Sequence, residues 1–300
     1  TDGQFPGFVP GQIPVEAQNM KQFNERKIKN GIALGVASLC AARGLFLLFI
    51  ILFDVLKNGL GAINWRLFLE DPAPPTMAGA GGLKSAFLGQ GLLTLTAAVI
   101  GVPIGILGGT FLAEYGRHKK ISRVISVLSD IAVSSPSIVI GTFVHAIRGK
   151  PSGSYNGWAG AAALAIIILP SIIRTTEDMI NMVPWTLREA AFALGAPYHK
   201  VIWSIVYRSA AGGIFTGVLL AIARIAGETA PLLFTSFNYS FFKLTMSEPV
   251  PSLTVSIYQY AASPYENWVG MAWAAAFVVT CFVLFLNIIG RLAIRFKVKV

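Results

Sequence analysis

The chain has few charged residues for its length. Only 13% of its 300 residues are Asp, Glu, Lys or Arg, whereas soluble domains carry roughly 25%. The mean hydropathy is correspondingly high, at +0.65. This shortage of charge excludes an ordinary soluble domain. The apolar residues come in runs close to the ~20 that a helix needs to cross ~30 Å of hydrocarbon, so the sequence predicts an all-α polytopic membrane protein.

Cysteine and histidine are also scarce. The two cysteines, Cys40 and Cys281, fall inside predicted spans, where we expect packed small residues rather than a disulfide or a metal pair. The three histidines are scattered along the chain and predict no metal site: His118, His145 and His199.

The segment GAGGLKS at 79–85 lacks one feature of a phosphate-binding loop. That motif requires Gly directly before the Lys, and Leu83 occupies this position. We therefore predict no nucleotide site and no bound cofactor. No nucleophile, general base and metal cluster share one membrane depth, so we predict no catalytic residues and no enzyme activity for this chain.

What the chain does contain is six apolar segments. The predicted spans are, in order, 31–56, 85–113, 122–147, 157–174, 209–234 and 268–290. The net charge of +10 predicts cytoplasmic loops rather than a nucleic-acid partner, because Lys and Arg gather on the inner side of membrane proteins. Their distribution places both termini and a polar insert in the cytoplasm. We expect membrane lipid, and no nucleic acid, as a partner.

The chain divides into a tail and one domain. Residues 1–30 are rich in Pro, Gly and basic residues and predict a flexible cytoplasmic tail. Residues 31–300 predict a single transmembrane domain. Arg43 interrupts the first span and is interpreted as a snorkelling or subunit-facing residue.

The polar insert contains a predicted hairpin at about 184–208. Pro184 suits the first turn of a helix, and the following run TLREAAFAL has high helix propensity. Gly195 then ends that helix, and Pro197 restarts the chain as a second one. Two interpretations remain open from the residues alone. The hairpin either enters a groove of another protein or lies as an amphipathic element on the membrane.

Four charges stand in or at the ends of apolar spans. Arg174 and Glu177 are spaced i, i+3, and Arg224 and Glu228 are spaced i, i+4, so each pair shares a helix face. They are either structural ion pairs or the lining of a path for a polar solute. Asp130 is expected to pair with an inner-side Lys. A kink is expected at Pro136.

Four motifs carry a resemblance to a known family: REAAFALGA (188–196), FLAEYGR (111–117), SPSIVIG (135–141) and GETAPLLF (227–234). The first resembles the EAA loop of ABC-importer permeases. Together they resemble the PstA-type permease subunits of phosphate-specific ABC importers, over about 85–290. The longer Pro/Gly-rich tail and Arg43 depart from the family pattern, and neither touches the matching motifs.

The resemblance implies the type I ABC-importer permease fold in a bacterial plasma (inner) membrane. It implies half of a phosphate path in which Arg174, Glu177, Arg224 and Glu228 matter. It also implies ATPase coupling through the EAA residues Glu189, Ala190, Ala191 and Gly195.

The implied partners are a sister permease (PstC-type), an ABC ATPase dimer (PstB-type) that uses the ATP, and an external phosphate-binding protein (PstS-type). The alternatives are a permease of the same fold for another oxyanion, such as sulfate or molybdate, and a secondary transporter or channel that acts alone. No inverted repeat is visible, which counts against the last.

Overall fold

The structure is a computed structural model that describes residues 15–74, 81–116, 119–149, 154–239 and 245–297. Within these residues it is almost entirely helical, with one isolated bridge between Pro72 and Gly81. The chain forms two compact units, Thr1–Asp54 and Val55–Val300. The elements are, in order, α1 (Val15–Ala62), α2 (Arg66–Leu69), α3 (Lys84–Thr110), η1 (Phe111–Tyr115), α4 (Lys120–Ser134), α5 (Ser137–Val144), η2 (His145–Gly149), α7 (Gly157–Asn181), α8 (Trp185–Ala193), α9 (Tyr198–Val201), η3 (Ile202–Val206), α10 (Tyr207–Ala226), α11 (Ala230–Thr235), α12 (Leu253–Ala261) and α13 (Glu266–Lys297).

Five of the described helical segments are long and apolar enough to cross a membrane, and a bent pair makes a sixth. The five are 26–62, 84–115, 157–181, 198–226 and 266–292. The sixth joins α4 to the segment that begins with α5. The all-helical, multi-pass architecture predicted from the sequence is therefore confirmed.

Two predicted spans differ from the expectation, one in where its helix begins and the other by a bend. α1 begins at Val15 and runs without a break through residue 30, where the tail was expected to end, and through Arg43. Residues 1–14 lie outside the described part of the chain. The predicted span 122–147 is not one helix, because it bends by 107° between α4 and α5. Pro136 stands at this bend, as expected for a residue without a backbone donor.

The predicted span 209–234 is also wrong as a single helix. α10 ends at Ala226, and α11 begins only at Ala230. The intervening Gly-Glu-Thr is not helical. The loop that follows α11 contains a short helix, α12, which the sequence reading did not predict.

The core of Val55–Val300 lies where α3, α7, α10 and α11 meet, around Leu93, Leu164, Ile168 and Ile225. Glycines recur every four residues on α3 and face α7: Gly101, Gly105 and Gly109. A Cβ at Gly105 would lie 2.7 Å from the side chain of Ile172. The two helices are therefore in close contact, as small residues permit in membrane proteins.

Two of the sequence motifs meet in space at the broken spans. Gly141, the last residue of SPSIVIG, packs against Pro231 of GETAPLLF, and a Cβ there would lie 2.6 Å from Pro231 Cα. Segments far apart in the sequence are thus joined where each span is interrupted.

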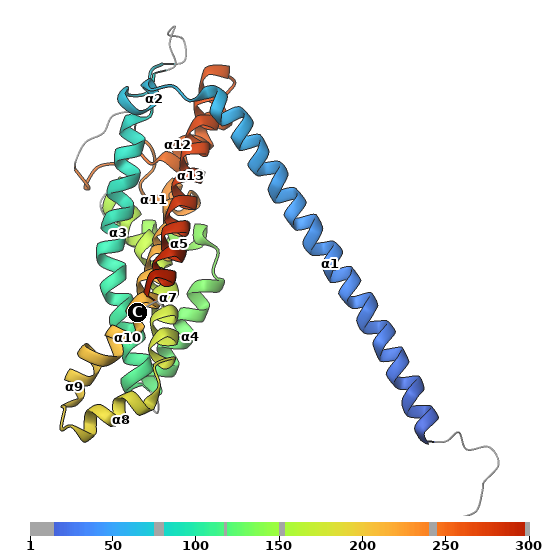
Figure 1. The fold of residues 1–300 in the computed structure, drawn as a ribbon. Helices are drawn as coiled ribbons and strands as arrows, with labels where there is room; N and C mark the ends of the chain where they lie inside the picture. The colour runs from blue at the N-terminus through green and yellow to red at the C-terminus, as the bar shows by residue number, and fades with distance from the viewer. Residues whose placement is uncertain (1–14, 75–80, 117–118, 150–153, 240–244, 298–300) are drawn as a thin grey trace, which may run out of the picture. The chain divides into compact units, whose positions relative to one another are not determined.

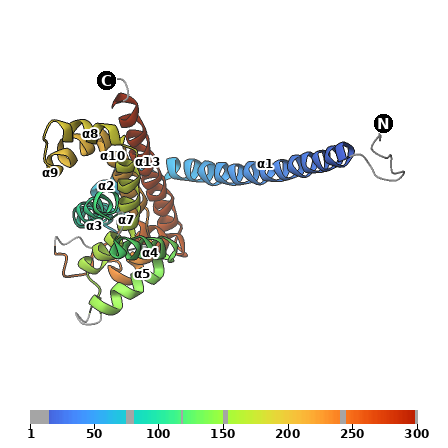
Figure 2. The same cartoon turned by 90° about the horizontal axis from the view of Figure 1, so that it is seen from below.

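The helices of the second unit place the hairpin at one end. Figure 1 shows α8 and α9 at the end opposite α2 and α12. Figure 2, turned by 90°, shows them projecting to one side of α10 while α4 and α5 lie on another side.

The free cysteines Cys40 and Cys281 are both exposed, so the expectation that they pack inside the chain is wrong.

Candidate functional site

The predicted hairpin is present and its turn is at Gly195. Pro184 precedes the first turn of α8, and Pro197 precedes α9. Gly195 has φ +76°, a left-handed conformation that side chains with a Cβ resist. A Cβ at this position would meet nothing within 4 Å. The requirement for glycine here therefore comes from the backbone angle and not from crowding.

The EAA residues divide between the two faces of α8. Ala191 is buried and packs in an apolar cluster with Val201 and Val206. Glu189, Ala190 and Gly195 are exposed. Leu194, at the tip, is 89% exposed. One face of the hairpin thus contacts the rest of the chain, while the other face is exposed and carries a charge, small residues and a leucine.

The base of the hairpin contains a buried ion pair that the sequence reading missed. Arg188 Nη2 lies 2.7 Å from Glu114 Oε1, and the two side chains are only 6% and 3% exposed. The Tyr198 hydroxyl donates to Glu114 Oε2 at 2.9 Å. Glu114 belongs to FLAEYGR and lies in η1, which continues α3, so this cluster ties α8 and α9 to a transmembrane segment.

Arg188 also binds the end of α7. Its guanidinium donates to the carbonyl oxygens of Val183 (2.6 Å) and Ile180 (3.1 Å). A cation there satisfies carbonyls that a helix end leaves free. A single buried side chain therefore joins the hairpin to both α3 and α7. The one sequence signal for it was a lone acid in an otherwise apolar stretch.

Arg174, near the same end of α7, stands between two carboxylates. Its Nη2 donates to Asp130 Oδ1 at 2.7 Å. Its Nη1 lies 3.7 Å from Glu177 Oε2, which is too long for a hydrogen bond. That Glu177 oxygen is buried and has no hydrogen-bond partner. The predicted Arg174–Glu177 pair is present, but the partner expected for Asp130, an inner-side Lys, is wrong.

Arg224 and Glu228 form the second predicted pair, with Nε and Oε1 3.8 Å apart. Their side chains are 49% and 19% exposed. Arg224 lies in the last turn of α10 and not in the middle of a span, because the helix stops at Ala226. Glu228 occupies the break between α10 and α11.

Two polar residues that the sequence did not predict bind the backbone carbonyl groups at this break. Gln90 of α3 donates to the carbonyl oxygen of Ala226 at 3.2 Å. Thr254 of α12 donates to that of Glu228 at 2.9 Å. Backbone groups released by a broken span need such partners, because the hydrocarbon offers none.

The two arginines lie at different depths of one helix pair. Thr175, next to Arg174, packs opposite Gly217 of α10. Arg224 follows Gly217 by seven positions, which corresponds to about 10 Å along the α10 axis. The chain therefore presents two half-exposed guanidinium groups, each beside a carboxylate, at successive levels.

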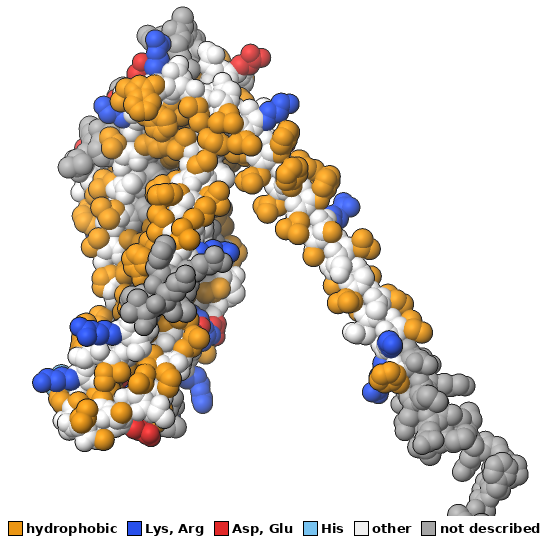
Figure 3. Space-filling view, in the orientation of Figure 1, with side chains coloured by type: hydrophobic (Ala, Val, Ile, Leu, Met, Phe, Trp, Pro, Cys, Tyr) orange, Lys and Arg blue, Asp and Glu red, His pale blue; other side chains and the backbone are white. Residues whose placement is uncertain are grey.

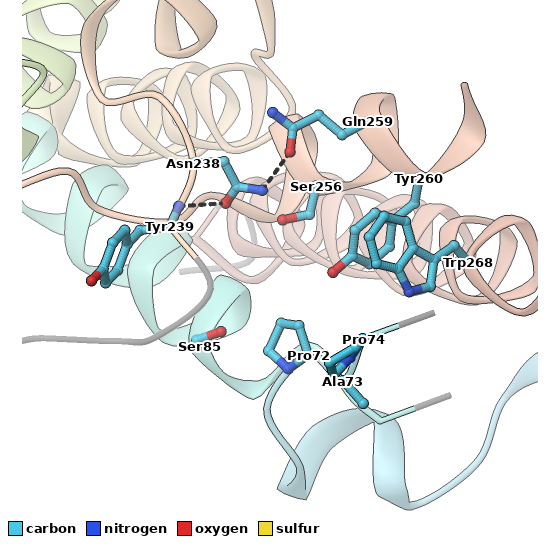
Figure 4. Close-up of a pocket in the computed structure, with 10 residues that line it drawn as sticks. All are labelled: Pro72, Ala73, Pro74, Ser85, Asn238, Tyr239, Ser256, Gln259, Tyr260 and Trp268. Carbon is cyan, nitrogen blue, oxygen red and sulfur yellow. Dashed lines mark hydrogen bonds between the residues drawn. The ribbon is translucent and has the colours of Figure 1, made fainter. Parts of the chain in front are cut away.

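A separate cavity of about 430 Å³ lies at the end opposite the hairpin. Figure 4 shows Asn238 bonded to Gln259, and Tyr260 beside Trp268. Burial raises the pKa of the Tyr260 phenol, so this side chain is a neutral donor at ordinary pH. Among the described residues, the lining contains no Lys, Arg, Asp or Glu, so those residues offer no charged partner to an anion.

The described residues contain no group of three or more His, Cys, Asp or Glu arranged to hold a metal ion. Arginine–carboxylate pairs lie instead at the base of the hairpin, on α7 and at the end of α10. An all-helical membrane domain with broken spans, internal ion pairs and a projecting helical hairpin is the architecture of a transport permease.

The family of binding-protein-dependent transport system inner membrane components matches residues 101–297. The phosphate transport system permease protein PstA of Pasteurella multocida is 49% identical over 92% of this chain and 98% of its own length. The PstA of Haemophilus influenzae is 46% identical over 93% and 98%. The chain belongs to this family of inner membrane components and, within it, to the PstA-type permeases.

Solved structures share the fold. A chain of the methionine ABC transporter MetNI, in an inward-facing conformation, has a TM-score of 0.55 and 19% identity, covering 70% of this chain and 92% of its own. A chain of an amino acid ABC transporter has a TM-score of 0.54 and 17% identity, covering 71% and 92%. The type I ABC-importer permease fold implied by the sequence motifs is confirmed.

Proposed function

We propose that this chain is a transmembrane permease subunit of an ATP-driven phosphate importer and forms half of the translocation path. The assignment of phosphate as the substrate rests on the similarity to phosphate permeases, which is 49% identity over 92% of the chain. The half-exposed arginines agree with an anionic solute. The similarity to phosphate permeases does not favour the alternative substrates, sulfate and molybdate.

Arg174 is suited to exchange partners as an anion passes. Its bond to Asp130 is short, and the unbonded oxygen of Glu177 lies 3.7 Å away on its other side. A phosphate ion would take two donors of the guanidinium at once. Asp130 and Glu177 repel the anion and compete for the guanidinium, so binding stays weak enough for release. Arg224 and Glu228 provide the same arrangement about 10 Å further along α10.

The hairpin is assigned the contact with a cytoplasmic ATPase. Its exposed face, with Glu189, Ala190 and Leu194, suits insertion of a short helix into a groove. The buried Arg188 on the other face would carry a movement of the hairpin to α3 and α7. ATP hydrolysis belongs to the separate ATPase subunit, and this chain binds no cofactor.

The assembly we propose also contains a sister permease of the PstC type, an ATPase dimer of the PstB type and an external phosphate-binding protein of the PstS type. Both termini and the hairpin face the cytoplasm. The last statement is tested with single cysteines introduced into a Cys40→Ser/Cys281→Ser background, because both native cysteines are exposed. Reporters at Lys120 and His199 should react only from the cytoplasm, and one at Lys84 only from outside. Labelling from the opposite side at any of them would refute the orientation.

The substrate is tested in vesicles that contain the assembled importer, with ATP inside and the binding protein outside. We expect uptake of radiolabelled phosphate and none of sulfate or molybdate at equal concentration. The same vesicles without ATP provide the control. ATP-dependent sulfate or molybdate uptake in place of phosphate uptake would replace the substrate and leave the permease assignment intact.

A further inference from the structure

An apolar groove of about 630 Å³ runs between α3 and α10. Its size lies within the range of roughly 300–1,000 Å³ that is typical of small-molecule sites. One wall is formed by Val102, Pro103, Ile106 and Leu107, and the other by residues from Trp203 to Val218. The ion pairs of the proposed path contribute no residue to this lining.

The hydroxyl group inside the groove is already hydrogen-bonded. The Tyr207 hydroxyl is hydrogen-bonded to Thr110 Oγ1 at 2.7 Å, and the Tyr207 and Trp203 rings lie 5.1 Å apart. The walls therefore offer aliphatic and aromatic surface with no free hydrogen-bonding group of Tyr207. Such a surface fits a hydrocarbon chain and disfavours a polar solute.

The hairpin end of the groove is basic. Lys200 lies within one helical turn of Trp203, and Arg208 directly follows Tyr207. On the α3 side, Lys119 lies over the Phe111 ring at 5.7 Å, one turn beyond Leu107. All three cations are exposed, and within the described part of the chain none forms an ion pair. Figure 3 shows Lys and Arg side chains at this end of the unit, around α9 and the start of α10.

The acidic groups nearby leave this charge uncompensated. Glu114 is buried with Arg188. Glu189 lies on α8 and forms no ion pair among the described residues. The groove thus combines an apolar trough at membrane depth with a Trp at its edge and cations at one end. Trp prefers the boundary between hydrocarbon and headgroups, so the cations stand at headgroup level.

We propose that this groove binds one anionic phospholipid, with an acyl chain along α3 and α10 and the phosphate headgroup at Lys200, Arg208 and Lys119. Charge complementarity selects the anionic headgroup, since each basic residue near an anionic lipid contributes about fivefold in affinity. The assignment requires only that the chain spans a membrane. It does not depend on the solute that the permease carries.

The test uses the full chain in vesicles and the fluorescence of Trp203. The chain has six tryptophans, so the Trp203 signal is taken as the difference between the wild type and a Trp203→Phe variant. The quenchers are phosphatidylglycerol and phosphatidylcholine, each brominated on its chains. We expect phosphatidylglycerol to quench Trp203 at a several-fold lower mole fraction than phosphatidylcholine.

Two variants separate the headgroup from the trough. Lys200→Gln/Arg208→Gln should bring the two lipids close to equal quenching, because each cation contributes about fivefold. Lys84→Gln, which removes a cation at the opposite end of α3, should leave the preference for phosphatidylglycerol unchanged. Ala211→Phe, which fills the groove, should weaken quenching by both lipids, and thermal unfolding of each variant reports that it is folded.

The proposal is overturned by either of two results. Equal quenching by both lipids would show that the site does not select an anionic headgroup. Absence of Trp203 quenching would mean that protein, such as a second copy of this chain, covers the groove.

Discussion

Two arginine–carboxylate pairs in this chain have the same bond length and opposite surroundings. Arg188 Nη2 lies 2.7 Å from Glu114, and Arg174 Nη2 lies 2.7 Å from Asp130. The first pair has side chains that are 6% and 3% exposed, whereas the second has 50% and 61%. The distance alone would give them one role. Their burial indicates two different roles, because a buried charge is stabilised mainly by its partner, whereas an exposed charge is also stabilised by water.

The additional contacts widen this difference. Arg188 also donates to two carbonyl oxygens, and Glu114 also accepts from Tyr198. All of these partners lie on helices except Val183, which is in the bend between α7 and α8. Arg174 has one short bond and one nearby acceptor that it does not reach. The buried cluster is therefore a rigid joint, and the exposed one is a place where partners can change.

The largest effect is expected from breaking the joint. Arg188→Ala leaves Glu114 buried without its cation, a loss of about 3–5 kcal/mol in the free energy of unfolding. It also leaves the carbonyls at the end of α7 without donors. The amount of folded protein in the membrane and its thermal unfolding in detergent measure this loss. Arg123→Ala is the matched control, because Arg123 is exposed and forms no ion pair in the described chain, and we expect a change within ~0.5 kcal/mol. Equal stability of the two variants would show that burial does not distinguish these arginines.

A smaller effect is expected at the turn of the hairpin. Gly195→Val places a β-branched residue at φ +76°, at a cost of about 1–2 kcal/mol. Because the added side chain meets no neighbour, the strain should alter the exposed tip and leave the buried joint intact. Binding of the ATPase subunit and phosphate-stimulated ATP hydrolysis should fall while the protein still inserts. Ala193→Val, two residues away at normal φ, is the control. Wild-type assembly and hydrolysis in the Gly195 variant would argue against the hairpin as the contact.

The comparison also shows what the sequence could predict. The hairpin, the glycine at its turn and the two ion pairs followed from local spacing, because i, i+3 and i, i+4 residues share a helix face whatever the tertiary structure. Glu114–Arg188 joins residues 74 positions apart. No local spacing predicts such a pair.

The break in the predicted span 209–234 was missed for a related reason. The sequence stays apolar across 209–234, but the helix stops at Ala226. The carbonyl oxygens released there accept hydrogen bonds from Gln90 and Thr254. These two partners come from distant segments, α3 and α12. At Pro136, by contrast, the missing donor belongs to the residue itself, so the bend could be anticipated.

A still smaller effect on stability is expected at the exposed pair. Asp130→Ala removes the short bond to Arg174, and solvent-exposed pairs contribute only about 0–1 kcal/mol. Arg174 should then turn to the unbonded oxygen of Glu177. We expect near-normal thermal unfolding together with a phosphate uptake rate that is changed severalfold, measured in vesicles with the assembled importer. A loss of folded protein comparable to that of Arg188→Ala would place Asp130 in the structural class.

The smallest change in stability and the sharpest test of role belong to Arg224→Lys. The substitution retains the positive charge beside Glu228, 3.8 Å away in the native chain, and Arg224 is half-exposed, so thermal unfolding should shift by less than ~1 kcal/mol. It removes the planar guanidinium, which can bind two oxygens of one anion at once where an ammonium presents a single point charge. If Arg224 contacts phosphate, uptake should fall by about tenfold or more, because a charged hydrogen bond contributes about 1.5–3 kcal/mol. Arg66→Lys is the matched control: Arg66 also pairs with a carboxylate four residues on, at 3.7 Å, but lies outside the spans, and its variant should transport normally. Uptake and ATP hydrolysis equal to wild type in Arg224→Lys would make this arginine a charge-balancing residue like Arg66, and the path would then run past Arg174 alone.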